Sequence, residues 1–397
     1  MDFDALLQSD FQKFILENLE QEISVLSLKK NPFPEIPWTT IANQIVAKKK
    51  AKNKLPTWFN NNNIIYPATI SIEQTSSEIA ALHKSNIVSG DLLVDLTGGF
   101  GVDSFYLSKK ISNIIHCEID NDLSKIVQHN FKILNVNNIE YKIGDGFDIL
   151  QTIQPKIDWI YIDPSRRSDK KGKVFMLEDC LPNVPQLLPK YFNYADKILV
   201  KTAPILDITA GLLELKNVKN IHILAIENEV KELLWEICKD YNGAITIKTC
   251  NHTKIKNQTF EFEMTINQNN CQYSLPKKYL YEPNAAILKS GSFNAVANAF
   301  ILTKLHQHSH LYTSDKLIDF PGRIFSIVDV LEYSNKKIIK QYFENTKHNV
   351  TTRNFPLTVE NIRKKWKILD GGNRYSFFTT DINNNKIVLI CEKIENQ

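Results

Sequence analysis

The stretch Leu92-Leu93-Val94-Asp95-Leu96-Thr97-Gly98-Gly99-Phe100-Gly101-Val102-Asp103 decides how this chain folds. It begins with an apolar run typical of a buried parallel strand, and that strand ends in the acid Asp95. Three glycines then fall within four positions, which permits positive φ angles and lets a ligand approach the backbone closely. Helical spacing resumes at Ser104-Phe105-Tyr106-Leu107-Ser108. We therefore predict a strand, a glycine-rich turn and a helix, with a ligand at the turn.

The residues around this turn exclude two common classes of glycine loop. No Lys-Ser/Thr pair follows the glycines, as phosphate-binding NTPase loops require. The G-G-x-G spacing also differs from the dinucleotide fingerprint G-x-G-x-x-G, and Asp95 would repel a pyrophosphate. An acid here suits a cationic amino-acid ligand, and S-adenosylmethionine carries both an amino group and a sulfonium. We expect its methionine part to be bound by Asp95, Thr97, Gly98, Gly99, Gly101 and Asp103.

Two further predicted strands end in acids. The second strand, 114–120, contains Glu118, which lies 23 positions after Asp95. Doubly wound sheets place an acid at about this spacing to hydrogen-bond ribose hydroxyls. The third unit, 139–147, contains Asp145, whose carboxylate can accept from an adenine amino group or can instead cap the following turn. We expect the nucleoside part of the cofactor to be bound by Glu118, Ile119, Asp145 and Gly146.

The fourth predicted strand, 157–162, runs into Asp163-Pro164-Ser165-Arg166-Arg167. Pro164 favours an extended backbone at Asp163, which brings this carboxylate to the edge where open α/β sheets bind ligands. The two arginines can clamp a phosphate or a carboxylate, or can simply solvate the loop. We expect catalytic contributions from Asp163, Pro164 and Arg166, with Asp163 orienting the nucleophile or acting as its base.

The N-terminal region, up to about residue 55, shows apolar residues near helical spacing and predicts helices. The second of these helices is expected to be capped by Thr39 or Thr40 and to end in the basic run 48–54. Such a run is usually a solvated helix end, and contact with a nucleic acid is the alternative.

Beyond the fourth strand, the pattern continues to alternate between strands and helices. A mobile lid or surface loop is expected at 168–174. An amphipathic helix is predicted around 233–237, between a strand at 221–226 and strand candidates at 245–247 and 260–264. The alternation predicts a doubly wound, mostly parallel α/β sheet with helices on both faces.

The C-terminal part differs in charge from the rest of the chain. Composition shifts at the Asn-rich stretch 267–270, which marks a boundary. From residue 270 onward, 18 Lys+Arg stand against 11 Asp+Glu, a charge of +7 within a chain total of +4. This charge favours a polyanionic partner such as RNA, although lysines that only solubilise a surface give the same sum. In the basic helix predicted at 358–367, Arg363 and Lys367 are expected to share one face.

The chain as a whole has the composition of an ordinary soluble protein. Its 397 residues, 43% hydrophobic and 23% charged, predict two or three domains. No apolar run approaches the length of a membrane span, and the acidic N-terminus is unlike a signal or transit peptide. The six cysteines are scattered without metal-ligand spacing, so we expect neither a metal nor disulfides, and a cytoplasmic location. Nothing in the sequence indicates an oligomeric state.

The order of Asp95 with its glycines, Glu118-Ile119-Asp120, Asp145-Gly146 and Asp163-Pro164 resembles that of class I S-adenosylmethionine-dependent methyltransferases. More narrowly, the segments VDLTGGFGVDS, YIDPSRR and TRNFPLTVENIRKKWKILDGG resemble bacterial proteins with a THUMP-like domain. The resemblance implies a Rossmann-like methyltransferase core followed by a small C-terminal ferredoxin-like and THUMP-like α/β module. It also implies S-adenosylmethionine as cofactor and RNA, either tRNA or rRNA, as partner.

These considerations predict four parts of the chain. They are a helical N-terminal region at 1–71, a methyltransferase domain at 72–268, a ferredoxin-like segment at 275–322 and a THUMP-like domain at 323–397.

The chain departs from its relatives in features that leave the methylated atom open. Amino-group methyltransferases commonly carry an aromatic residue where this chain has Ser165-Arg166, and no cysteine nucleophile follows Asp163-Pro164 closely. A helix around 233–237 would also replace the usual hairpin. One alternative is a noncatalytic RNA-binding protein that retains the methyltransferase fold. A nicotinamide-dependent oxidoreductase is the weaker alternative, because G-x-G-x-x-G is absent.

Overall fold

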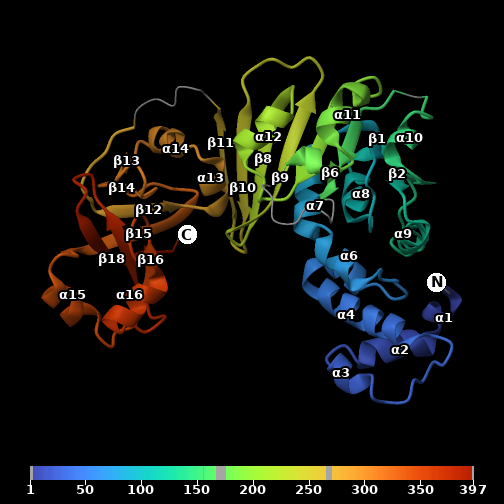
Figure 1. Cartoon of the computed structure of the whole chain (residues 1–397), viewed down its shortest axis with the longest axis horizontal. Helices are drawn as coiled ribbons and strands as arrows, with labels where there is room; N and C mark the ends of the chain where they lie inside the picture. The colour runs from blue at the N-terminus through green and yellow to red at the C-terminus, as the bar shows by residue number, and fades with distance from the viewer. Residues whose placement is uncertain (1–2, 155, 167–175, 265–270, 396–397) are drawn as a thin grey trace. The chain divides into compact units, whose positions relative to one another are not determined.

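The computed structural model describes residues 3–154, 156–166, 176–264 and 271–395 (Figure 1). The chain divides into two compact units, Met1–Lys219 with Leu234–Asn242, and Asn220–Leu233 with Gly243–Gln397. The loop expected at 168–174 and the boundary expected at 267–270 lie outside the described residues.

Short helices form the N-terminal part of the first unit, as predicted. They are α1 (Phe3–Leu7), α2 (Ser9–Glu17), α3 (Ile23–Leu26), α4 (Trp38–Lys54), α5 (Pro56–Phe59) and α6 (Thr69–Gln74). The predicted cap of the long helix was wrong. Helix α4 begins at Trp38 directly after Pro37, whose φ of −59° leads into a helix and whose side chain cannot accept a capping hydrogen bond. Thr39 and Thr40 therefore lie inside the first turn.

The basic run of α4 is held by partners within the first unit. Lys48 is 2% exposed and lies 5.7 Å from the ring centroid of Phe59, and burial lowers the pKa of its ammonium group. The neighbouring lysines form ion pairs, Lys49 and Lys52 with Glu20 and Lys50 with Glu73. The run is thus a structural feature of this unit.

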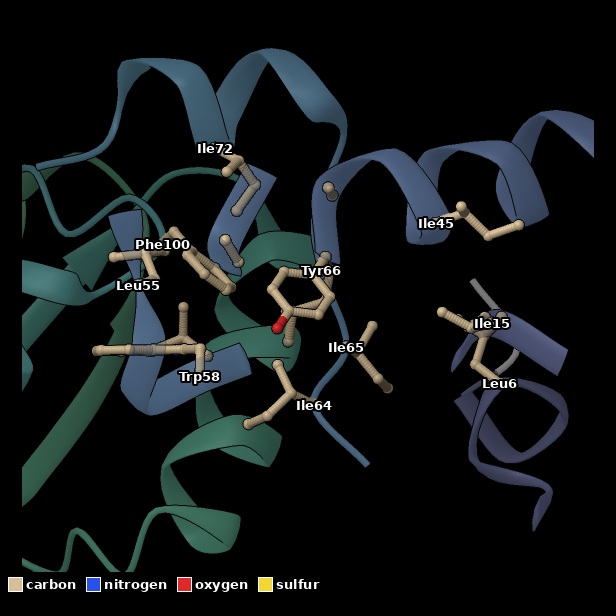
Figure 2. Close-up of a cluster of buried hydrophobic side chains, with 14 of the residues drawn as sticks. Leu6, Ile15, Ile45, Leu55, Trp58, Ile64, Ile65, Tyr66, Ile72 and Phe100 are labelled. Atoms are coloured by element: carbon tan, nitrogen blue, oxygen red, sulfur yellow. The ribbon is translucent and has the colours of Figure 1, made fainter. Parts of the chain in front are cut away.

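A buried cluster joins these helices to the glycine turn (Figure 2). Trp58 is fully buried, and its ring centroid lies 6.2 Å from that of Phe100 and 4.9 Å from that of Phe105. Figure 2 shows Trp58, Tyr66 and Phe100 pointing toward one another. Asn130 adds a polar link, since its amide accepts from the Ile65 N–H (2.9 Å) and donates to the Ile65 carbonyl (2.8 Å).

The described residues of the first unit include a run of parallel strands in the order β3-β2-β1-β4-β7. The strands are β1 (Gly90–Asp95), β2 (Ile111–Glu118), β3 (Ile139–Ile143), β4 (Trp159–Ile162) and β7 (Lys197–Thr202). The order reverses direction at β1, so the carboxyl edges of β1 and β4 form a topological switch point, where such sheets bind ligands. The predicted doubly wound, mostly parallel sheet is confirmed.

Helices precede, connect and follow these strands in the sequence. They are α7 (Glu78–Ser85), α8 (Val102–Leu107), α9 (Asn121–Ile133), α10 (Gly146–Leu150), α11 (Val184–Tyr191) and α12 (Ile208–Glu214). A short 3-10 turn, η1 (Leu177–Asp179), and a two-stranded sheet of β5 (Ser165–Arg166) and β6 (Cys180–Leu181) lie between β4 and α11.

The helix predicted around 233–237 was wrong, because this segment is a strand. Strand β8 (Val218–Ile226) turns at Glu227-Asn228 into β9 (Glu229–Cys238). Both turn residues have positive φ, 48° and 64°, as a tight two-residue hairpin turn requires. Leu233, Leu234 and Trp235 are consecutive apolar residues buried on both faces of the strand, and periodicity alone cannot separate such a run from a buried helix. The usual hairpin is therefore present.

The second unit adds strands beside β8 and then a separate sheet. Strand β10 (Thr246–His252) runs parallel to β8, and β11 (Asn257–Glu263) runs antiparallel to β10. A seven-stranded sheet follows in the order β13-β14-β12-β15-β18-β17-β16. Its strands are β12 (Tyr279–Pro283), β13 (Thr303–Lys304), β14 (Tyr312–Ser314), β15 (Gly322–Glu332), β16 (Asn349–Thr352), β17 (Arg374–Thr380) and β18 (Lys386–Ile394).

Four helices accompany the seven-stranded sheet. They are α13 (Ala285–Ser290), α14 (Phe293–Ala299), α15 (Lys336–Phe343) and α16 (Val359–Trp366). Apolar residues of α15 and α16, including Phe343 and Trp366, pack with Phe378 and Val388 on one face of the sheet. The prediction that Lys367 continues the basic helix was wrong, because its φ of 53° ends α16 at Trp366.

Among the described residues, no helix has both the length and the apolar character needed to cross a membrane.

We predict that Trp58→Ala destabilises the chain by about 3–5 kcal/mol, because it leaves a cavity against Phe100 and Phe105. Urea unfolding followed by circular dichroism measures this loss. Leu28→Ala is the matched control, since Leu28 is 87% exposed and should change stability by less than about 0.5 kcal/mol. Equal effects of the two substitutions would contradict the shared core.

Candidate functional site

The glycine turn is held from below by Asp95, the last residue of β1. Its Oδ1 accepts from the Thr97 N–H (3.0 Å), and its Oδ2 accepts from the Ser104 hydroxyl (2.6 Å). Asp95 is 1% exposed, and this burial raises the pKa of its carboxyl group to about 7. The Asp95 side chain thus lies under the turn, with both oxygens already engaged.

The three glycines of the turn are required for different reasons. A Cβ added to Gly98 would lie 2.2 Å from the His116 ring, and one added to Gly101, where φ is 79°, would lie 2.7 Å from the Phe131 ring. Gly99 also has a positive φ of 55°, but its added Cβ would meet nothing closer than the Thr97 carbonyl oxygen at 3.9 Å. The turn therefore has no space for a side chain at Gly98 or Gly101, whereas the space beside Gly99 is open.

The end of β2 is bonded directly to this open part of the turn. Glu118 accepts from the Gly99 N–H through Oε2 (2.8 Å) and from the Asp120 N–H through Oε1 (2.8 Å). Each carboxylate oxygen retains capacity for a further hydrogen bond. The next residue, Ile119, is 73% exposed, so an apolar side chain stands uncovered beside this carboxylate.

The end of β3 contacts the other side of the turn. Asp145 caps α10, with Oδ1 accepting from the N–H groups of Phe147 (2.8 Å) and Asp148 (3.2 Å). Its Oδ2 accepts no hydrogen bond from the described residues, and the side chain is exposed. A Cβ added to Gly146 would lie 2.4 Å from the Leu96 carbonyl oxygen, which shows how closely the two strand ends approach. Asp145 is thus both a cap and a free acceptor.

The end of β4 is fixed to the turn through Thr97. The Asp163 N–H donates to the Thr97 hydroxyl (2.7 Å), and Asp163 Oδ2 pairs with Lys201 Nζ at 2.5 Å. Pro164 follows, half-buried, and Arg166 lies in β5. The structure does not describe the Arg166 side chain, and Arg167 lies outside the described residues.

A buried ion pair supports the same edge from α7 and α8. Lys84 is fully buried and lies 3.0 Å from Asp103 Oδ1, while Asp103 Oδ2 accepts from the hydroxyls of Tyr161 (2.7 Å) and Ser76 (3.0 Å). Burial alone would raise the pKa of Asp103, but the positive charges of Lys84 and Lys201 and the Tyr161 hydrogen bond hold it below its usual range. Asp103 is therefore a paired, ionised group that fixes α8.

Sequence reasoning missed Lys84 and Lys201. Lys201 lies near the end of an apolar strand, at the same edge as the acids, and this position was an available signal. No local pattern marks Lys84, because its partner Asp103 is contributed by a different helix.

The arrangement brings the four strand ends to one turn. Glu118 binds the Gly99 N–H, Asp163 binds Thr97, Gly146 packs against Leu96, and Asp95 supports the turn from below. The accessible surface combines acceptors, an open glycine and the exposed apolar Ile119. This set suits a ligand that carries hydroxyl and amino donors together with a flat apolar ring.

Comparisons with known proteins extend over the whole chain. Residues 279–321 match a family model for a ferredoxin-like domain, and residues 322–393 match one for a THUMP domain-like family. The crystal structure of a candidate methyltransferase from Porphyromonas gingivalis W83 is 30% identical, with a TM-score of 0.87, and the match covers 99% of each chain. No curated protein matches the sequence significantly.

Other solved structures match only part of the chain. TrmK of M. capricolum in complex with S-adenosylhomocysteine is 13% identical, with a TM-score of 0.31, and the match covers 40% of this chain and 68% of TrmK. An rRNA methylase from Streptococcus thermophilus is 12% identical, with a TM-score of 0.30, and the match covers 42% of this chain and 99% of the methylase. Scores this low establish neither fold nor function for this chain.

We predict that Asp95 makes stability depend on pH. Because its pKa is raised from 3.8 to about 7, the folded chain binds more protons than the unfolded chain in this window, so the free energy of unfolding falls as pH rises from about 4 to about 7. Burial lowers the pKa of His116 from 6.5 to about 4, which contributes the opposite slope. The quantity to measure is therefore the difference between the parent and Asp95→Asn.

Urea unfolding at several pH values gives the free energy of unfolding of each protein. The value for the parent minus the value for Asp95→Asn should decrease as pH rises from about 4 to about 7. A difference independent of pH would show that Asp95 titrates normally.

Proposed function

This chain belongs to the bacterial THUMP-like-domain family of class I S-adenosylmethionine-dependent methyltransferases, and on that basis we propose that it methylates RNA. The observation that carries the proposal is the meeting of Asp95, Glu118, Asp145 and Asp163 around one glycine turn at the switch point of a parallel sheet. S-adenosylmethionine supplies the methyl group, which it carries on a positively charged sulfur.

The free acceptors of the site fit the nucleoside part of this cofactor. Glu118 would accept from the ribose hydroxyls, because its two oxygens are held in place by the Gly99 and Asp120 N–H groups. The unused Oδ2 of Asp145 would accept from the adenine amino group. Ile119, which is 73% exposed, would pack against the adenine ring. Gly146, which admits no Cβ, keeps the β3 end close to the turn.

The methionine part would lie over the open turn at Gly99. Asp95 acts here as a positioning residue, because its oxygens are occupied by Thr97 and Ser104 and it is 1% exposed. Thr97, Gly98 and Gly101 set the path of the turn, and Asp103 fixes α8 through Lys84. We therefore propose that Asp95 supports the methionine part indirectly, by holding the turn, and not through the direct contact that the sequence predicts.

Asp163 would orient the nucleophile. Its Oδ2 is held by Lys201 and its backbone by Thr97, which leaves Oδ1 without a hydrogen bond from the described residues. A fixed carboxylate with one free oxygen can hold a donor group in line for transfer, and such positioning supplies much of the rate enhancement. Pro164 and Arg166 would line the substrate side of the same edge.

RNA as the substrate is supported by two features of the second unit. Residues 322–393 match the THUMP domain-like family, and the chain from residue 270 onward carries a charge of +7. We also propose the domain limits 1–71, 72–268, 275–322 and 323–397. A cytoplasmic location fits the six cysteines, which are all free.

Mass spectrometry of nucleosides tests the function directly. RNA from a strain lacking the gene should lack one methylated nucleoside that the parent strain contains, and expression of the intact chain should restore it. Isothermal calorimetry with S-adenosylmethionine and with NADH separates the cofactor classes. Binding of NADH alone would support an oxidoreductase and refute the proposal.

We predict that Glu118→Ala weakens the binding of S-adenosylmethionine about ten- to a hundred-fold. The loss of charge-assisted hydrogen bonds to the ribose should cost about 1.5–3 kcal/mol. Calorimetry measures the Kd. The matched control is Glu140→Ala on the neighbouring strand β3, where the glutamate pairs with Lys142 at the surface. An unchanged Kd in a folded Glu118→Ala chain would remove the cofactor assignment.

We predict that Asp163→Ala retains the affinity for S-adenosylmethionine but lowers turnover at least about a hundred-fold, because its free oxygen acts on the nucleophile. Transfer of a radiolabelled methyl group to RNA from the deletion strain measures turnover, and calorimetry measures the Kd. Parallel losses of affinity and turnover would instead make Asp163 a cofactor-binding residue.

A further inference from the structure

Most arginines of the second unit form ion pairs with neighbouring acids. Glu282, whose side chain is 3% exposed, pairs with both Arg323 and Arg353. Arg363 of α16 pairs with Asp370 at 2.5 Å. Lys367, which follows the same helix, pairs with Glu344 at 2.9 Å. The basic helix predicted at 358–367 therefore offers much less free charge than its sequence suggests.

Unpaired positive charge lies instead around a hollow on the THUMP-like part. The hollow has a volume of about 430 Å³ and is bounded by α15, by residues 346–348 and by Arg374 at the start of β17. Lys347 and Arg374 are both exposed, and neither pairs with an acid among the described residues. Within the described residues, the Arg374 side chain donates to the Tyr342 hydroxyl, at 3.2 Å. The described residues that line the hollow include no aspartate or glutamate.

The remaining walls are aromatic, aliphatic and neutral. Tyr342 and Ile338, which is 43% exposed, come from one side of α15. His348 is 1% exposed, and its Nδ1 lies 2.8 Å from the Ser376 hydroxyl. Burial and the nearby Arg374 charge lower the pKa of His348 to about 4, so the imidazole is neutral at pH 7. The positive charge of the hollow thus comes from Lys347 and Arg374.

We propose that this hollow binds one nucleotide of a single-stranded RNA, with Lys347 and Arg374 on its phosphate and Tyr342 against its base. Two cations that form no salt bridge with the described residues favour an anion, and the guanidinium of Arg374 matches a phosphate in two-point geometry. An aromatic ring beside basic groups is the arrangement by which proteins stack single-stranded bases. A volume of about 430 Å³ lies within the range of small-molecule pockets.

The assignment rests on the proposed function for the identity of the polymer, RNA. It adds the place at which the THUMP-like part holds the strand. It also replaces the helix 358–367 as the main contact.

The test uses the intact chain and a fluorescein-labelled oligouridine of about ten nucleotides, with binding followed by fluorescence anisotropy over a range of salt concentrations. The pocket variant is Lys347→Gln with Arg374→Gln. The matched control is Lys337→Gln with Lys364→Gln, which removes the same charge from exposed residues of α15 and α16 outside the hollow. Thermal melting confirms that each variant is folded.

The pocket variant should bind at least about tenfold more weakly and lower the salt slope by about 0.7, the value for one phosphate contact to a single strand. The control should change the affinity by no more than about twofold. Tyr342→Ala should weaken binding about five- to a hundredfold without changing the salt slope. Equal effects of the pocket and control variants, or no RNA binding by the parent, would overturn the proposal.

Two further measurements identify the source of the ligand. If AMP binds as tightly as the oligouridine and with the same dependence on Arg374, the hollow serves a free nucleotide and the proposal for a strand fails. Calorimetry with S-adenosylmethionine on the same proteins reports on the cofactor site separately. A parent that binds RNA through the hollow but binds no S-adenosylmethionine would refute the proposed methyltransferase function and leave the RNA contact standing.

Discussion

The candidate site depends on one buried carboxyl group. Asp95 lies beneath the turn in a place from which water is excluded, and a buried carboxyl is tolerated there only because Thr97 and Ser104 satisfy it. With Thr97 fixed in this way, its hydroxyl is available to the backbone of Asp163. The Gly99 N–H is likewise directed to Glu118. The positions of the accessible groups thus follow from a residue that is itself buried.

The strand-end acids could be predicted because their placement follows from local rules. An apolar run that stops at an acid gives a strand end, and parallel strands bring such ends to the same edge. The segment 233–237 could not be assigned in this way, since a run buried on both faces shows no alternation. The partnership of Lys84 with Asp103 could not be predicted either, because it joins two helices and leaves no spacing in the sequence. The role of Asp95 under the turn also required the structure.

Charge was the property for which sequence and structure differed most. A sum of +7 is correct for the C-terminal part, yet Arg323, Arg353 and Arg363 are already paired with acids. In the N-terminal part, Lys48 lies buried against aromatic rings. A polyanion responds only to charges that lack such partners. Composition therefore indicates a class of partner, whereas the place of contact depends on which cations remain free.

The packing of Phe100 on Trp58 has a consequence for how this protein can be divided. A fragment that begins at residue 72 would contain every strand of the parallel sheet but would expose Phe100 and Phe105 to water. The backbone of Ile65, which bonds to Asn130, would be missing as well. The proposed limit between 1–71 and 72–268 thus separates two regions of the sequence that share one buried core. A fragment that keeps this core intact has to include the first helices.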